Sequence, residues 1–376
     1  MADLHLGYRR YNKITPAGFN QREVDVSQAF REAVTRAAAL KPDITVIAGD
    51  VFHSVRPSNA VLTFCFREMR RLVEESGAPV VISAGNHESP KRADSGNALR
   101  LLSEIKGVYV ADSKESVFRF PEIQVAVTCL PHVSLLQSGP NRVRADDRFK
   151  FNVLVVHAQL DDRWVSDFGG AQVNIRDLSP HEWDYVALGH VHFMKEVALN
   201  AAYSGALEHT SLNFWAEGSL EKGFLEVELP SQKRLFHGLT SPREVLVLEA
   251  VEASGASVEQ VMQMLSDRLE SVPGGIEGKL LRLEIRDIPH EVQRQLDWKR
   301  IRGWRALALN LTLDMRVPRD HQVLRSFKTS SGMQLERELE QFCAARNFHG
   351  VKNQAVVELL REYLKELEKQ QEAGQG

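Results

Sequence analysis

The sequence lacks the features of several large protein classes. No apolar run reaches the roughly 18 residues that a membrane-spanning helix requires, and the first residues do not form an apolar export signal. The three cysteines form no C-x-x-C pair, which argues against a disulfide framework and a thiolate zinc site. Low-complexity tracts and repeats are also absent. We therefore expect a cytoplasmic protein without a membrane partner.

An excess of positive charge is also missing. The formal net charge is −3 and the isoelectric point is near 6.5, so any nucleic-acid binding must come from local patches. The 376 residues, 43% of them hydrophobic, are enough for two or three domains that each bury a core.

Short apolar runs alternate with helical patterns up to about Leu229. The runs are rich in β-branched residues and predict buried strands at residues 44–48, 80–84, 125–129, 153–156 and 185–188. Apolar residues at helical spacing over 61–73 predict an amphipathic helix that covers the sheet. This alternation is typical of an α/β domain.

A stretch with several proline, glycine and serine residues after Leu229 predicts a domain boundary near residue 235. Beyond it the pattern predicts strands at 245–249, 279–285 and 306–314 and helices at 257–269 and 290–296. We therefore expect a first domain over 1–235, a small α+β domain over 236–325 and a helical segment over 326–376.

Polar residues suited to metal binding lie at or just after the ends of apolar runs in the first part of the chain. In order they are Asp3-Leu4-His5, Gly49-Asp50-Val51-Phe52-His53, Gly85-Asn86-His87-Glu88, Val156-His157-Ala158 and Gly189-His190-Val191-His192. The carboxyl ends of strands are where open α/β sheets bind ligands. One such motif has little meaning alone, whereas the ordered set predicts a single metal site.

The spacing within these motifs supports shared ligation. Asp3 and His5 are two residues apart, so an extended backbone points both side chains to one side, and His190 and His192 repeat this spacing. Carboxylate, amide and imidazole donors suit Mn²⁺, Fe²⁺ or Zn²⁺. The carboxylate of Asp50 could bridge two ions.

Two cations about 3.5–4 Å apart can clamp a phosphoryl oxygen and activate a water as hydroxide. The sequence therefore favours phosphoester hydrolysis. His87 is next to a proposed ligand but outside the ligand pattern, which suits a histidine that stabilises charge or protonates the leaving oxygen. We expect Glu88 to orient it.

The motifs D-x-H, G-D-x-x-H, G-N-H-[DE], H and G-H-x-H, in this order, resemble the calcineurin-like metallophosphoesterase superfamily. Four segments are similar to its SbcD-type branch of DNA repair exonucleases: Asp3-Leu4-His5-Leu6-Gly7, Gly49-Asp50-Val51-Phe52-His53, Tyr203-Ser204-Gly205 and Lys222-Gly223-Phe224. The resemblance covers most of residues 1–229. It implies a four-layer α/β sandwich followed by a small capping domain and C-terminal helices.

The resemblance also implies roles for individual residues. One ion would be held by Asp3, His5, Asp50 and His192, and the other by Asp50, Asn86, His157 and His190. His87 would be the catalytic histidine, and His53 would contact the region of the scissile phosphate. In the family both ions are typically manganese, and the substrates are DNA ends, hairpins or single strands.

Two positions depart from the family pattern. Only Met1 and Ala2 precede the first motif, where the family has its first strand, so we expect the chain either to lack a central strand or to begin at a misassigned start codon. Glu88 stands where aspartate is usual, and its longer arm is expected to shift His87 and change the rate.

The resulting prediction is a metal-dependent nuclease that hydrolyses DNA phosphodiester bonds in end processing and repair. A phosphodiesterase or phosphatase acting on a nucleotide or another small molecule is the alternative within enzymes. A non-catalytic DNA-binding scaffold subunit is the alternative from another class.

Two features outside the motifs concern partners. A basic cluster interleaves with Trp298 and Trp304 and suits DNA binding as well as it suits a solvated face; it consists of Lys299, Arg300, Arg302 and Arg305. An apolar stripe along the C-terminal helical segment suits docking to another chain. The resemblance implies a homodimer and an SbcC-type, SMC-like ATPase partner bound through these helices.

Overall fold

The structure, a computed structural model, describes residues 1–89, 96–139, 143–160, 171–317 and 355–359. Contacts divide the chain into two compact units. The first comprises Met1–Val251, Ser257–Ile285 and Gln295–Asp314. The second comprises Glu252–Ala256, Arg286–Arg294 and the chain from Met315 onward.

A three-stranded parallel sheet opens the fold. Its order is β1 (Thr45–Ala48), β2 (Val80–Ser83) and β3 (Val108–Ala111), with Thr45 opposite Val80 and Val80 opposite Val108. The predicted strands at 44–48 and 80–84 are thereby confirmed. Every residue of β2 is buried, as expected for a parallel strand that is covered on both faces.

A six-stranded sheet faces the first. Its order is β10 (Lys195–Ala198), β11 (Ala201–Tyr203), β9 (Tyr185–Gly189), β6 (Phe151–His157), β5 (Val125–Leu130) and β4 (Ser116–Phe120). The strands from β11 to β5 pair in parallel, and β10 and β4 are antiparallel edges. The remaining three predicted strands of the first domain are confirmed here.

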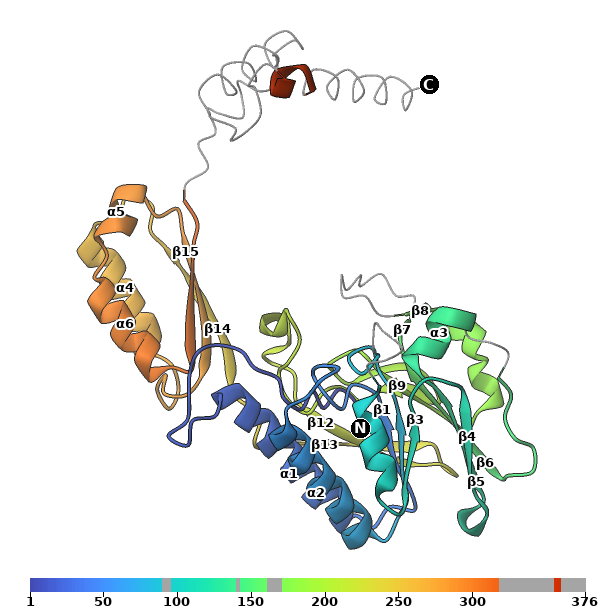
Figure 1. The fold of residues 1–376 in the computed structure, drawn as a ribbon. Helices are drawn as coiled ribbons and strands as arrows, with labels where there is room; N and C mark the ends of the chain where they lie inside the picture. Colours follow the sequence, from blue (N-terminus) through green and yellow to red (C-terminus); the bar gives the residue numbers. More distant parts are fainter. Residues whose placement is uncertain (90–95, 140–142, 161–170, 318–354, 360–376) are drawn as a thin grey trace. The chain divides into compact units, whose positions relative to one another are not determined.

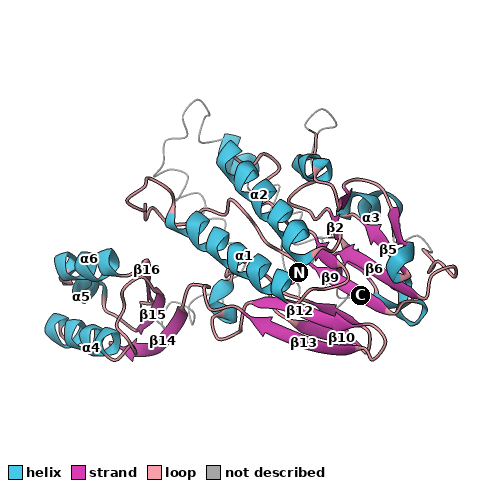
Figure 2. Ribbon diagram, turned by 90° about the horizontal axis from the view of Figure 1, so that it is seen from below, coloured by secondary structure: helices cyan, strands magenta, loops and turns pink. Residues whose placement is uncertain are grey.

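Helices α1 (Gln21–Ala39) and α2 (Asn59–Ser76) lie side by side against the first sheet (Figures 1 and 2). Between the sheets lies a buried cluster that includes Ala48, Val81 and Val127. The outer face of the second sheet is covered by α3 (His132–Ser138) and by short segments whose Leu178 and Trp183 are buried. This order of helix, sheet, sheet and helix confirms the predicted four-layer α/β fold.

Local sequence explains where α2 begins and ends. The Ser58 side chain accepts a hydrogen bond from Val61 N at the first turn, and Gly77 ends the helix in a left-handed conformation (φ 77°). Its buried residues include Val61, Cys65 and Leu72, so the predicted amphipathic helix over 61–73 is confirmed. Cys65 and Cys129 are buried free thiols, and Cys343 lies outside the described residues.

Smaller elements complete the chain up to Gly238. The strands are β7 (Gln159–Leu160), β8 (Gln172–Val173), β12 (Gly223–Glu228) and β13 (Lys233–Gly238). Short 3-10 helices cover Ala98–Glu104, Pro121–Ile123, Ile175–Leu178, Pro180–Glu182 and Phe214–Glu217.

A third sheet follows, with the order β14 (Val245–Glu252), β15 (Leu280–Arg286) and β16 (Asn310–Met315). The helices in this part of the chain are α4 (Val258–Glu270), α5 (His290–Gln295) and α6 (Trp298–Leu307) (Figure 1). The predicted strand at 306–314 was wrong at its start, because α6 continues to Leu307 and β16 begins at Asn310. The predicted boundaries of all three domains stay predictions.

In the second unit, Ala253 N donates to Arg286 O (2.9 Å) and Ile288 N donates to Arg316 O (3.1 Å). Most of the predicted helical segment 326–376 lies outside the described residues; within it, 355–359 are helical. Among the helices that the structure describes, none combines the length and apolar character needed to cross a membrane.

Candidate metal centre

The motif residues predicted from the sequence meet at one end of the two sheets. Asp50 follows β1, Asn86 follows β2, His157 ends β6, and His190 follows β9. The segment that begins with Asp3 runs beside β1, because Asp3 N donates to Gly49 O (3.0 Å). The fold therefore gathers groups that are far apart in the sequence.

The Asp50 carboxylate is at the centre of this group. Its Oδ2 lies 3.4 Å from His157 Nε2, 3.7 Å from His5 Nε2 and 3.9 Å from His87 Nε2. Its Oδ1 accepts a hydrogen bond from His87 N (2.9 Å). Only 2% of the Asp50 surface is exposed, so the carboxylate is directed at these neighbours rather than at solvent.

Asp3, His5 and His192 form one potential ligand group, with donor atoms within 4.8 Å of one another. His5 Nε2 faces His192 Nε2 at 3.0 Å, and Asp3 Oδ1 lies 3.9 Å from His192 Nε2. Two facing ring nitrogens require a proton or a cation between them, since unprotonated lone pairs would repel each other. This arrangement fits a metal ion.

A second group of donor atoms lies near Asp50. Asn86 Oδ1 is 3.0 Å from His157 Nε2 and 3.2 Å from His190 Nδ1. Asp3, Asp50 and His157 also form a potential ligand group. His157 Nδ1 donates to Ala48 O (2.8 Å), which leaves Nε2 as the ring nitrogen that can bind an ion.

His87 and His53 lie beside these groups. His87 Nδ1 donates to His53 O (2.7 Å), so its Nε2 is the atom that faces Asp50. The His87 side chain is 33% exposed, and a substrate can therefore reach it. His53 Nδ1 lies 3.4 Å from His5 Nδ1, which places both histidines next to the first ligand group.

Burial sets the charge of three of these histidines, whereas the nearby Asp50 carboxylate raises the pKa of His157 to about 10. Burial lowers the pKa of His5 to about 3 and the pKa values of His53 and His190 to about 4. The three rings are therefore neutral at neutral pH, which is the form that binds metals. Burial also raises the pKa of Asp3, and a bound cation would favour its ionised form.

Backbone strain is concentrated at the same place. Asp3, His5, Asp50 and His190 all have positive φ values, of 53°, 48°, 52° and 102°, and such conformations cost free energy in residues other than glycine. Gly85 permits the close approach of two loops, because a Cβ at this position would collide with the Asp50 side chain and with Asp50 N.

Glu88 does not orient the His87 ring as expected from the sequence. Its carboxylate instead accepts hydrogen bonds from three backbone N–H groups, those of Gly85 (2.9 Å), Asp50 (3.1 Å) and Phe52 (2.7 Å). The carboxylate therefore joins the loop after β2 to the loop after β1.

Sequence reasoning missed the groups that support His192. Thr210 Oγ1 lies 3.3 Å from His192 Nδ1. The buried Lys222 donates to His192 O (2.6 Å) and pairs with Glu217 (2.7 Å). The Lys222-Gly223-Phe224 motif marked Lys222, but no motif marked Thr210.

Two histidines outside the sequence motifs are buried. His132 is 3% exposed and His209 is 4% exposed, and the Nδ1 atom of each lacks a protein partner among the described residues. Neither belongs to the potential ligand groups found in the described part of the chain.

The basic cluster of the sequence lies on α6, and its four members are exposed: Lys299, Arg300, Arg302 and Arg305. Arg300 donates to Ser266 Oγ (2.7 Å) and stacks over Trp304 at 5.1 Å. Arg305 Nε donates to Leu311 O (3.3 Å). These contacts hold two of the four cations in place, and DNA binding by the cluster stays a prediction.

Sequence comparison identifies related proteins named for DNA repair. The chain is 28% identical over 237 residues to the DNA double-strand break repair protein Mre11 of Methanocaldococcus jannaschii, covering 61% of each chain. It is also 28% identical to the protein of the same name from Methanococcus maripaludis, and the match covers 51% of this chain and 50% of that one. The Mre11 protein of Sulfurisphaera tokodaii is 29% identical, and the match covers 51% of this chain and 48% of that one. The matches thus span between 48% and 61% of these relatives.

A family model described as calcineurin-like phosphoesterase matches residues 1–194 of the 376. The matched segment is more than half of the chain, and it contains every proposed metal ligand from Asp3 to His192. The chain therefore belongs to the calcineurin-like phosphoesterase family.

Proposed function

We propose that this protein is a metal-dependent DNA nuclease that hydrolyses phosphodiester bonds in DNA end processing and repair. The observation that carries the proposal is the convergence of carboxylate, amide and imidazole donors around Asp50. The names of the Mre11 relatives support DNA as the substrate.

The proposed site holds two divalent ions, which we expect to be manganese. Asp3, His5, Asp50 and His192 would hold one ion, and Asp50, Asn86, His157 and His190 would hold the other. When bound, such ions clamp a phosphoryl oxygen and lower the pKa of a water so that it can attack phosphorus. The Asp50 carboxylate serves both sites because it faces both groups of donors.

His87 and His53 are the residues of this chain that we propose act on the substrate. His87 Nε2 lies 3.9 Å from Asp50 Oδ2 on a side chain that is 33% exposed, and its Nδ1 proton is held by His53 O (2.7 Å). From this position Nε2 stabilises developing charge or gives a proton to the leaving oxygen. His53 would contact the scissile phosphate.

The wider contacts are proposals as well. Exposed cations on α6 would bind the DNA backbone through Lys299, Arg300, Arg302 and Arg305. We propose a homodimer and an SMC-like ATPase partner that is bound through residues 326–376, most of which lie outside the described residues.

The test is degradation of end-labelled linear DNA by the purified chain in Mn²⁺, beside a chelated sample. A small bis-aryl phosphodiester serves as a second substrate, and Asp50→Asn serves as the inactive control. Mn²⁺-dependent DNA cleavage that is lost in Asp50→Asn supports the proposal. Hydrolysis of the small ester alone would assign a small-molecule phosphodiesterase, and DNA binding without hydrolysis of either substrate would assign a scaffold subunit.

A further inference from the structure

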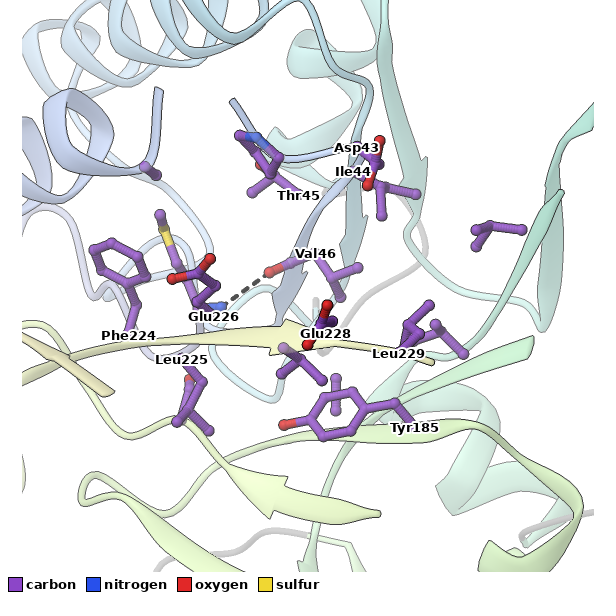
Figure 3. A pocket seen from close by; sticks show the side chains of 18 of the residues that line it. Asp43, Ile44, Thr45, Val46, Tyr185, Phe224, Leu225, Glu226, Glu228 and Leu229 are labelled. Atoms are coloured by element: carbon purple, nitrogen blue, oxygen red, sulfur yellow. Dashed lines mark hydrogen bonds between the residues drawn. The ribbon is translucent and has the colours of Figure 1, made fainter. Parts of the chain in front are cut away.

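Different parts of the fold hold the two sides of the first ligand group. The segment that carries Asp3 is bonded to β1 and the loop after it through its backbone. Asp3 N donates to Gly49 O (3.0 Å). The hydrogen bond drawn at Val46 in Figure 3 joins Met1 N to Val46 O (3.0 Å). His192 lies outside the strands, between β9 and β10, so strand pairing does not fix its side chain.

The backbone carbonyl of His192 is held by other parts of the chain. Lys222 Nζ donates to His192 O (2.6 Å), and Ala206 N donates to the same oxygen (3.2 Å). These bonds place the carbonyl group, whereas the ring can still turn about its side-chain torsions. A further contact is needed to keep His192 Nε2 directed at His5 Nε2, which lies 3.0 Å away.

Thr210 supplies that contact. It is 5% exposed, and its Oγ1 lies 3.3 Å from His192 Nδ1 and 3.5 Å from Glu208 O. A hydroxyl carries one proton and can also accept, so it can donate to Glu208 O while it accepts from Nδ1–H. A neutral imidazole has a single ring proton. When that proton is on Nδ1, the lone pair of Nε2 is free for an ion.

A buried group of charges precedes Thr210 in the chain and packs around it. Arg22, Asp25 and Glu208 are each 1% exposed. Arg22 pairs with Asp25 (2.9 Å) and with Glu208 (3.3 Å). It also donates to His209 O (2.7 Å). Buried charges are costly unless they are paired, so these groups resist displacement.

The Glu208 carboxylate also holds the backbone. Its Oε1 accepts from His209 N (2.7 Å), and its Oε2 accepts from Arg243 N (2.8 Å). The carboxylate therefore fixes the turn that leads to Thr210. A neutral amide in its place would direct an NH₂ group at one of these N–H donors or at Arg22.

We propose that Thr210 and Glu208 are positioning residues for His192: Thr210 selects the tautomer of the ring, and Glu208 holds Thr210 in place. Neither residue is among the potential metal-binding groups that the described residues form. This role depends on the proposed metal centre, in which His192 is a ligand through Nε2. The affinity for that ion is then set in part by groups that the ion does not touch.

The first experiment measures Mn²⁺ binding to the full chain by isothermal titration calorimetry. Thr210→Val keeps the shape of the side chain but removes the acceptor of the Nδ1 proton. We expect the affinity of one ion site to fall about 10- to 100-fold, the usual effect of losing an outer partner of a metal-binding histidine. Thr210→Ser keeps the hydroxyl and should bind as tightly as the unaltered chain. Thr63→Val, at an exposed position on α2, is the matched control. Equal affinity of Thr210→Val and the unaltered chain would overturn the proposal.

The second experiment needs no metal. Nitrogen-15 NMR of the histidine rings, at a pH of about 8 where an ordinary histidine is neutral, shows which ring nitrogen carries the proton. His192→Asn assigns the signals of His192. We expect the Nδ1–H form in the unaltered chain and in Thr210→Ser, and loss of this preference in Thr210→Val. A tautomer that does not respond to Thr210→Val would contradict the proposal.

The two experiments separate the positioning role from the metal centre itself. If the unaltered chain bound no Mn²⁺ but its His192 tautomer depended on Thr210, the proposed metal centre would be wrong and the positioning of the ring would stand. If the chain bound Mn²⁺ and Thr210→Val changed neither the affinity nor the tautomer, the metal centre would stand and the positioning role would be wrong.

Glu208 is tested by Glu208→Gln, with the exposed Glu104→Gln as its matched control. We expect Mn²⁺ affinity to fall about tenfold and part of the His192 population to change to the Nε2–H form. Urea unfolding shows whether the variant is folded. If it is not, Glu208→Asp provides the same comparison, because it keeps the charge but shortens the reach to the two N–H groups. A folded variant with unchanged affinity and tautomer would remove Glu208 from the proposal.

Discussion

The Asp50 carboxylate faces three histidine rings and is the residue on which the proposed metal centre depends most. Asp50→Asn keeps the shape of the side chain and removes its charge. We expect Mn²⁺ affinity to fall at least about 100-fold, since both ions would lose an anionic ligand. Isothermal titration calorimetry measures this loss, with the exposed Asp147→Asn as the matched control. Unchanged affinity in Asp50→Asn would remove Asp50 from the ligand set.

We propose that His87 acts on the substrate rather than on the ions, because its side chain is partly exposed and its Nε2 lies 3.9 Å from Asp50 Oδ2. We expect His87→Gln to slow DNA cleavage about 100-fold or more, the usual effect of losing a general acid, while Mn²⁺ binding remains. Single-turnover cleavage and calorimetry separate the two effects, and His181→Gln, at an exposed position, is the control. A parallel loss of metal binding would show that His87 is a ligand rather than an acid.

Some residues of the centre could not be predicted from the sequence. The proposed ligands were recognisable because each lies in a short motif at the end of an apolar run. Thr210 is 18 positions from His192, and Lys222 is 30 positions away, and neither spacing follows a local period. Such contacts arise only when separate elements meet in the fold.

At the scale of elements, Glu88 links the loops that follow β1 and β2. We expect Glu88→Gln to lower the free energy of unfolding by about 1–3 kcal/mol, because the amide nitrogen would face backbone N–H groups that now have an acceptor. Urea unfolding followed by circular dichroism measures the change, with the exposed Glu182→Gln as control. Equal stability of the two variants would show that the loops do not depend on this carboxylate.

The accuracy of the sequence predictions also differed between elements. The buried parallel strands were predictable because they are short β-branched runs bounded by glycine or polar residues. Helix α1 was not predicted, since its buried face is built largely from alanines and includes the charged Arg22 and Asp25. Those two form a buried ion pair (2.9 Å), which a hydrophobic pattern does not show.

For the whole molecule, buried neutral histidines link stability to pH. Burial lowers the pKa values of four of them to about 3 or 4: His5, His53, His190 and His209. Because the unfolded pKa is about 6.5, the unfolded chain binds more protons from these groups as the pH falls from 6.5 toward 4. They therefore destabilise the folded state over this range. Burial raises the pKa of Asp3 and Glu88, which acts in the opposite direction but involves fewer groups.

We therefore expect the urea midpoint of the metal-free protein to fall steadily between pH 6.5 and pH 4. Unfolding curves at a series of pH values, recorded by circular dichroism in the presence of a chelator, test this. A midpoint that stays constant down to pH 4 would mean that these histidines are accessible to protons in the folded state.

The central claim is that one site holds two divalent ions on either side of Asp50. The most direct measurement is anomalous diffraction from crystals of the full chain soaked in Mn²⁺. We predict two anomalous peaks about 3.5–4 Å apart, one among Asp3, His5 and His192 and the other among Asn86, His157 and His190. A single peak, or peaks away from Asp50, would contradict the two-ion account.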